Sequence, residues 1–169
     1  MITWIEKGHW LSDAIRNAGY NLHEPNGVKT TGNDVDDVAV QAIIDSFDPL
    51  PFAQAEAKEK IKEASAAKRL QYVTQAAGKD AEYIFKAQEA TQFDLDGTIG
   101  VFMQGRITRT GEAAVIVAQE WNDSASIWKQ VGALIAGIED DCSMALAAET
   151  DWTRCRTISL TAVADLEAI

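Results

Sequence analysis

Residues 110–146 read TGEAAVIVAQEWNDSASIWKQVGALIAGIEDDCSMAL, and this stretch decides the fold class. Apolar and small side chains recur in it at intervals of three and four over about nine turns, which is the spacing of one face of an α-helix. Asn122, Asp123 and Ser124 compete for backbone hydrogen bonds, so a break into two helices stays open there. The predicted face consists of Ala114, Val117, Trp121, Ala125, Trp128, Gly132, Ile135, Ile138, Cys142 and Ala145.

Tryptophans are spaced along this face. Large aromatic side chains at helical spacing serve as core or interface anchors more often than as part of a ligand site. We therefore expect a packing role for them. Our candidates for residues at a protein–protein interface are Trp4, Trp10, Trp121, Trp128 and Ile135.

The alanine-rich region before this stretch predicts two further helices. The first runs from Phe52 to Ala77, has only a narrow apolar stripe that includes Ile61 and Leu70, and is ended by Gly78. The second starts at Asp80 and reaches about Thr91. A helix with so thin a stripe gains most of its stability from packing. The pair either forms a helical hairpin within one chain or packs against other copies.

The first 48 residues have a different pattern of apolar and turn-forming residues, and this pattern predicts a small α+β module. Leu11, Ala14, Ile15 and Ala18 fall at helical spacing, and Gly19 is placed to end that helix. Segments 20–23 and 28–31 flank an Asn-Gly dipeptide, which is a strong signal for a β-hairpin. A second helix then runs to about Phe47. Its predicted buried stripe is Val35, Val38, Ala39, Ala42 and Ile43.

These patterns predict a mainly α protein with a small N-terminal α+β module of helix plus β-hairpin. The predicted segments are the module at 1–48, a helical hairpin at 49–93, a loop or hinge at 94–109, and a C-terminal helical region at 110–169. The last region would end in a short helix capped by Thr161. Heavy use of alanine and scarce proline agree with a helical fold.

Residues 93–99, Phe-Asp-Leu-Asp-Gly-Thr-Ile, resemble the nucleophile motif of haloacid-dehalogenase-type phosphatases. That resemblance implies Asp94 as nucleophile, Asp96 as general acid/base, and a Mg²⁺ ion between them. The preceding residues 86–92 are polar and helix-forming, whereas the motif requires a buried parallel strand. We therefore treat the phosphatase as a remote alternative. We expect Asp94 and Asp96 to cap or turn the backbone, with no bound metal.

Composition narrows the classes of function. The 169-residue chain carries a net charge of −11, which argues against a nucleic-acid partner because phosphate recognition needs clustered lysine and arginine. No apolar run approaches the roughly 20 residues that span a bilayer, and Met1–Glu6 lacks a signal-peptide layout. Cys142 and Cys155 are too few for a zinc site. We expect free, partly buried thiols, with a disulfide between them as the alternative. The sequence indicates no catalytic residues, metal or cofactor.

Several segments are similar to small virion proteins of tailed bacteriophages. They are Trp4–Gly8, Ala18–Tyr20, Asn26–Val28, Asp37–Asp45, Asp48–Pro51 and the end at Thr161–Ile169. The resemblance implies a non-enzymatic structural protein of a tail, fibre, baseplate or neck, made in the host cytoplasm, located in the virion and contacting other virion proteins. Long helices with exposed seams associate around an axis, so we expect a homo-oligomer, for instance a trimer. A tail-fibre assembly chaperone is the alternative.

Overall fold

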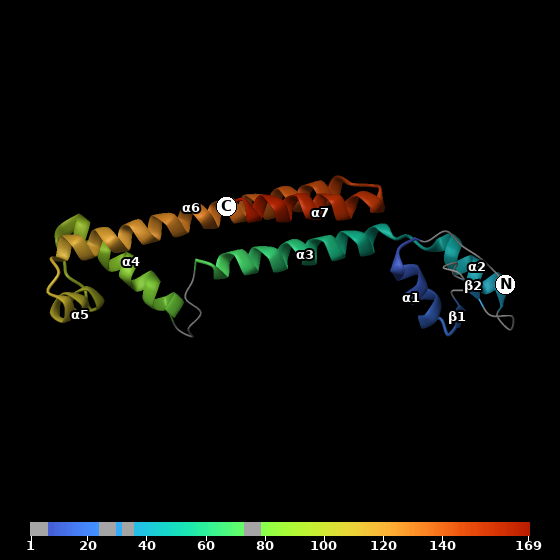
Figure 1. Ribbon diagram of the computed structural model, residues 1–169, viewed down its shortest axis with the longest axis horizontal. Coiled ribbons are helices and arrows are strands. Elements are labelled where there is room, and N and C mark those ends of the chain that lie inside the picture. Colours follow the sequence, from blue (N-terminus) through green and yellow to red (C-terminus); the bar gives the residue numbers. More distant parts are fainter. Residues whose placement is uncertain (1–6, 24–29, 32–35, 73–78) are drawn as a thin grey trace.

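A single long helix forms the spine of the protein. The computed structural model describes residues 7–23, 30–31, 36–72 and 79–169. Helix α6 (Ala114–Ala148) has 35 residues and, at 1.5 Å per residue, is about 52 Å long (Figure 1). The predicted long helix is confirmed, without a break. Ser124 Oγ donates to the carbonyl of Glu120 inside the helix, so this polar side chain bonds along α6 and does not interrupt it.

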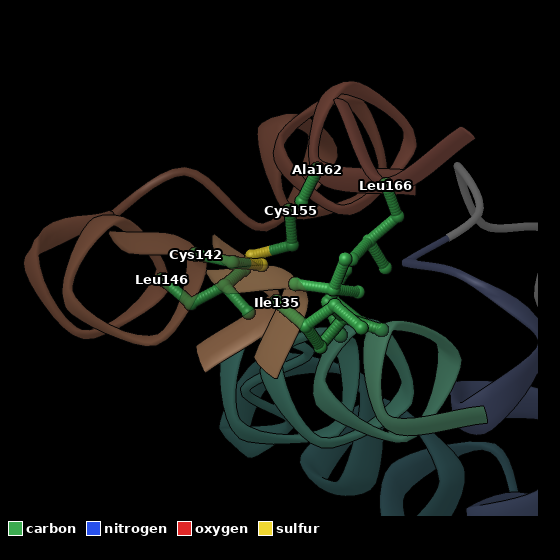
Figure 2. Close-up of a cluster of buried hydrophobic side chains, with 10 residues drawn as sticks. Ile135, Cys142, Leu146, Cys155, Ala162 and Leu166 are labelled. Atoms are coloured by element: carbon green, nitrogen blue, oxygen red, sulfur yellow. The ribbon is translucent and has the colours of Figure 1, made fainter. Parts of the chain in front are cut away.

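Two helices pack on the C-terminal half of α6. Helix α3 (Leu50–Leu70) and helix α7 (Trp152–Glu167) lie along it and make a three-helix bundle (Figure 1). Small residues of α3, Ala53 and Ala57, allow a close approach of the helices. The bundle core, drawn in Figure 2, contains Ala53, Ala57, Ile61, Val131, Ile135, Cys142, Leu146, Cys155, Ala162 and Leu166.

The other half of α6 carries a second, smaller core. Helix α4 (Lys79–Asp96) packs on α6, and the short helix α5 (Val101–Thr110) contacts both. Helix α5 ends where Gly111 adopts a left-handed backbone conformation with φ of 72°. The second core contains Ala90, Met103, Val117, Ala118 and Trp121.

Two short helices near the N-terminus form a third core. Helix α1 (His9–Asn17) and helix α2 (Asp37–Ser46) bury Leu11, Ile15, Val40 and Ile44 between them. The Lys7 ammonium donates to the carbonyls of Ile44 and Phe47 at 2.8 and 3.0 Å, where the negative end of the α2 dipole favours a cation.

An aromatic contact joins this unit to the bundle. The Trp10 ring lies 6.0 Å from the Trp152 ring, edge to face, and 6.4 Å from Phe52, measured between ring centroids. Trp10 packs against the bundle core. The three cores therefore lie in a row, with the bundle core between the N-terminal core and the second core (Figure 1).

The mainly α fold is confirmed, but the predicted β-hairpin is not supported as an element of the fold. Strand β1 (Leu22–His23) and strand β2 (Thr30–Thr31) pair antiparallel over two residues each, with Leu22 opposite Thr31. The predicted Asn-Gly turn lies outside the described residues. A two-stranded pair without further strands is marginal by itself, so the helices α1 and α2 supply the core of this unit.

The predicted helical hairpin at 49–93 is wrong. Helices α3 and α4 both exist, but each packs on a different half of α6. The thin apolar stripe on α3 is buried better in the groove between α6 and α7 than it would be against α4, because α6 and α7 both present apolar faces. The predicted loop at 94–109 is also too long. Only residues 97–100 are non-helical there, because α5 forms to bury Met103.

Two further predictions are wrong about position: the start of the last helix and the buried stripe of α2. Helix α7 begins at Trp152, where Asp151 accepts a hydrogen bond from the Thr153 N–H, so Thr161 lies inside the helix and caps nothing. In α2, Val40 and Ile44 are buried, whereas Val38 is 81% exposed. Apolar residues fill two overlapping stripes in this helix, and contact with α1 selects one of them.

Candidate functional site

The Asp-x-Asp-Gly-Thr segment forms the end of a helix. Helix α4 ends at Asp96, Gly97 has a φ of 77°, and the Gly97 N–H donates to the Phe93 carbonyl at 2.7 Å. Asp96 Oδ1 accepts a hydrogen bond from the Thr98 N–H at 2.9 Å. Hydrogen bonds from Thr98 hold the pKa of Asp96 below its ordinary value. The prediction that Asp96 turns the backbone is confirmed.

Asp94 has a different contact from the one expected. Its carboxylate accepts a hydrogen bond from Asn122 Nδ2 at 2.7 Å and so ties the end of α4 to α6. Neither carboxylate follows a β-strand, which is the setting that the phosphatase motif requires. Among the described residues, no group of three or more His, Cys, Asp or Glu is placed to hold a metal ion. The expected lack of a metal at this loop stays a prediction.

The two cysteines are free, as the sequence predicted, and both are buried in the bundle core rather than partly buried. Cys142 comes from α6 and Cys155 from α7, and Figure 2 shows their sulfur atoms directed toward each other. Burial raises the pKa of both thiols above the ordinary value. Buried, protonated thiols are poor nucleophiles, so this pair is arranged for packing rather than for chemistry.

The predicted interface residues lie in different surroundings. Trp121 is buried in the second core and Ile135 in the bundle core, so both side chains pack within the chain. Trp10 joins the N-terminal unit to the bundle. Trp128 is half-buried on α6, and Trp4 lies outside the described residues. None of the four described residues belongs to the line of exposed apolar side chains that also runs along α6.

This second apolar line along α6 is exposed. Ile116, Ile127 and Leu134 are 57%, 55% and 56% exposed. Ile127 follows Ile116 by 11 residues and Leu134 follows it by 18, so the three side chains lie within about 20° of one another around the helix axis. We call these three residues the outer α6 face. The sequence contains this pattern, but the stronger stripe that includes Val117, Trp121 and Ile135 conceals it.

A carboxylate that sequence reasoning missed holds the start of α5. Glu89 of α4 accepts hydrogen bonds from the Phe102 N–H at 3.1 Å and the Met103 N–H at 2.8 Å. A Cβ at Gly100 would lie 2.1 Å from the Glu89 Cδ, so only glycine leaves room for this contact. Glu89 lies 13 and 14 residues before the two N–H groups that it accepts from, so no short sequence motif indicates this contact.

Glu139, the first residue of the acidic run 139–141, has a structural role. The Arg69 guanidinium of α3 donates two hydrogen bonds to the Glu139 carboxylate, Nη1 to Oε1 at 3.0 Å and Nη2 to Oε2 at 2.6 Å. This bidentate pair joins α3 to α6 beside the bundle core. The hydrogen bonds from Arg69 lower the pKa of Glu139 and raise that of Arg69.

The Arg69–Glu139 pair predicts a pH dependence of stability. Because the folded-state pKa of Glu139 lies below its unfolded value near 4.3, the contribution is present above about pH 4.3 and is lost as the pH falls through the folded pKa. Glu139→Gln should lower the free energy of unfolding at pH 7 by about 1 kcal/mol, the upper end for partly exposed pairs. Urea denaturation at pH 7 and pH 3 tests this. A variant as stable as wild type at pH 7 would contradict it.

In the part of the chain that the structure describes, every helix is too short or too polar to cross a membrane. The outer α6 face is the candidate functional site, because its three half-exposed aliphatic side chains offer apolar contact to a partner. Comparison of the chain with protein-family models, curated proteins and solved structures finds no match.

Proposed function

We propose that this protein is a non-enzymatic structural component that acts by protein–protein docking and helical self-association. The sequence resemblance supports a location of this role in a tailed-phage particle, in the tail, fibre, baseplate or neck, with other virion proteins as partners. The observation that supports the proposal best is the outer α6 face. A second copy is its proposed occupant.

The geometry of α6 supports a second copy as occupant. The spacing of Ile116, Ile127 and Leu134 keeps all three on one straight seam about 27 Å long between its ends. Burying a fully exposed Ile or Leu side chain contributes about 1.5–3 kcal/mol, and these three side chains have about half of their surface left to bury. Three such side chains on each of two or three copies give a seam of the kind that joins long helices around an axis. A trimer is the oligomer that we propose.

Replacing Leu134 by Asp should weaken self-association roughly tenfold or more, because an apolar contact is lost and a charge must be desolvated. Sedimentation velocity over a range of concentrations measures the effect. The matched control is Ala136→Asp, which adds the same charge two residues away, at an exposed position about 200° around the helix. A wild-type chain that stays monomeric at every concentration would contradict the proposal, as would equal effects of the two substitutions.

The alternative is a tail-fibre assembly chaperone, a binding protein that is absent from finished particles. Its outer α6 face would cover a partner only during assembly. Mass spectrometry of purified virions separates the two functions, because a structural component is present in many copies and a chaperone is missing. For the remote phosphatase alternative, the test is Asp94→Asn. A Mg²⁺-dependent phosphatase activity that this substitution abolishes would overturn the structural role.

A further inference from the structure

A hollow with an unusual concentration of cations lies where α4, α5 and α6 meet. It has a volume of about 160 Å³. Val101, Phe102 and Trp121 give it an apolar lining, and Lys86, Arg106 and Arg109 stand around it. We call this cavity the basic hollow. Its volume is on the scale of one apolar side chain.

The side chains that line the basic hollow include more cations than carboxylates, whereas the whole protein has more carboxylates. The chain has 26 acidic and 15 basic residues, yet three cations and one carboxylate, Glu82, line this hollow. Lys86 pairs with Glu82, and its ammonium lies 5.5 Å from the centroid of the Trp121 ring. Arg106 pairs with Glu112 and Glu120 on the other side. These two cations are therefore already partly neutralised.

Arg109 differs from the other two cations. Its guanidinium makes no ion pair or hydrogen bond with the rest of the described chain and is exposed. It lies back over Gly105, where an added Cβ would be 3.5 Å from the Arg109 Nη1. A hollow with an apolar lining and one unneutralised guanidinium at its edge fits an apolar side chain that is flanked by carboxylates.

The chain itself carries a segment with that chemistry. At the end of α4, Leu95 is 78% exposed and stands between Asp94 and Asp96. Hydrogen bonds from Asn122 to Asp94 and from the Thr98 N–H to Asp96 hold both carboxylates in place. We call residues 94–96 the acidic knob. Because it is already ordered by these contacts, little conformational entropy would be lost when it docks.

The knob and the hollow point in opposite directions. Leu95 follows Lys86 by nine residues, which is about two and a half helical turns, so the two side chains lie on opposite sides of α4. A chain cannot fill its own hollow with its own knob. Two copies can join front to back, and a contact between two different surfaces closes into a ring or extends as a filament.

We propose that the acidic knob of one copy enters the basic hollow of a second copy, with Leu95 against Val101 and Phe102 and a knob carboxylate bound to Arg109. This inference rests on the proposed self-association and adds a second, heterologous contact to the outer α6 face. Together the two contacts give the chain the means to build an extended or ring-shaped assembly.

The test uses full-length chains that carry Leu134→Asp, so that contact through the outer α6 face is weakened. This parent chain is expected to self-associate at high concentration in sedimentation velocity. Adding Leu95→Lys or Arg109→Glu should each reduce association at least tenfold. Circular dichroism checks that both exposed substitutions leave the helices intact. The matched control is Val38→Lys, which changes another exposed apolar residue beside aspartates and should associate like the parent.

Mixing the two variants gives the sharpest result. The Arg109→Glu chain keeps an intact knob and the Leu95→Lys chain an intact hollow, so an equimolar mixture should form a heterodimer although neither variant associates alone. The altered knob and altered hollow stay mismatched, because Lys86 and Arg106 still face the introduced lysine. A monomeric Leu134→Asp parent, beside an oligomeric wild type, would overturn the knob contact and leave the proposed function standing. Loss of association in Val38→Lys, or no heterodimer in the mixture, would also overturn it. A monomeric wild type would refute both.

Discussion

Ile135→Ala is expected to lower the free energy of unfolding by about 2–5 kcal/mol, the range for large-to-small substitutions in a packed core. Ile135 is 0% exposed and lies in the bundle core, where α3, α6 and α7 meet. Removing its side chain loses apolar burial and leaves a cavity that three helices cannot close together. Urea denaturation followed by circular dichroism, at one fixed protein concentration low enough to keep the chains monomeric, measures the loss.

The neighbouring residue supplies the control. Leu134→Ala removes a similar volume one position away, but Leu134 is exposed, so the change should stay within about 0.5 kcal/mol. The pair of residues also separates stability from assembly, because Leu134 belongs to the outer α6 face and Ile135 to the core. Equal destabilisation by both substitutions would show that α6 is turned differently about its axis.

Glu89→Ala is expected to cost about 2 kcal/mol, because it leaves two N–H groups at the start of α5 without their charged acceptor. The affected donors are those of Phe102 and Met103, and Met103 is fully buried in the second core. Thermal unfolding followed by circular dichroism measures the change. Gln88→Ala, at an exposed position on the same turn, is the control and should have little effect.

Gly100→Ala tests the contact between the Glu89 carboxylate and the start of α5 by changing the α5 side of it. An added methyl group would displace the Glu89 carboxylate, so we expect a loss of about 1–2 kcal/mol from the missing cap. If both substitutions act on one contact, their effects should not add. The double variant should then be as stable as the less stable of the two single variants. Additive losses would mean that Gly100 is required for another reason.

The arrangement of cores has a consequence for how the protein meets its partners. Each core is small, and the cores are joined by α6 or by a few aromatic contacts, so much of the helical surface stays exposed. Apolar residues on α4, α5 and α6, such as Ile84, Val101 and Ile127, therefore face solvent in the isolated chain. Where exposed apolar side chains are contiguous, they mark sites of protein association. This agrees with the proposed structural role.

Much of the helical content could be predicted from the sequence. The periodic run that became α6, the glycine after α1 and the turn chemistry at Asp96-Gly97 all depend on residues within four or five positions of one another. Local spacing carries that information. The start of α7 differs from the predicted one because Asp151, rather than Thr161, caps the helix, although this signal is also local.

Other features could not be predicted, because they join residues that are distant in the chain. Glu89 contacts the start of α5 from 13 residues away, and Arg69 reaches Glu139 across 70 residues. The choice between two apolar stripes on α2 is made by α1. The partner of α3 is decided by the groove between α6 and α7, whose two helices lie later in the sequence. No local pattern contains these contacts.

The sequence by itself thus determined that this protein is helical, where its longest helix runs, and that the Asp-Leu-Asp-Gly segment ends a helix with a turn. The tertiary structure decided which helices are neighbours, which apolar line on α6 is buried and which is left exposed, and where the cations gather. The physical reason is that helix formation follows from contacts between near neighbours along the chain, whereas burial is settled only when helices compete for the same apolar surface. The exposed outer α6 face is what remains after that competition.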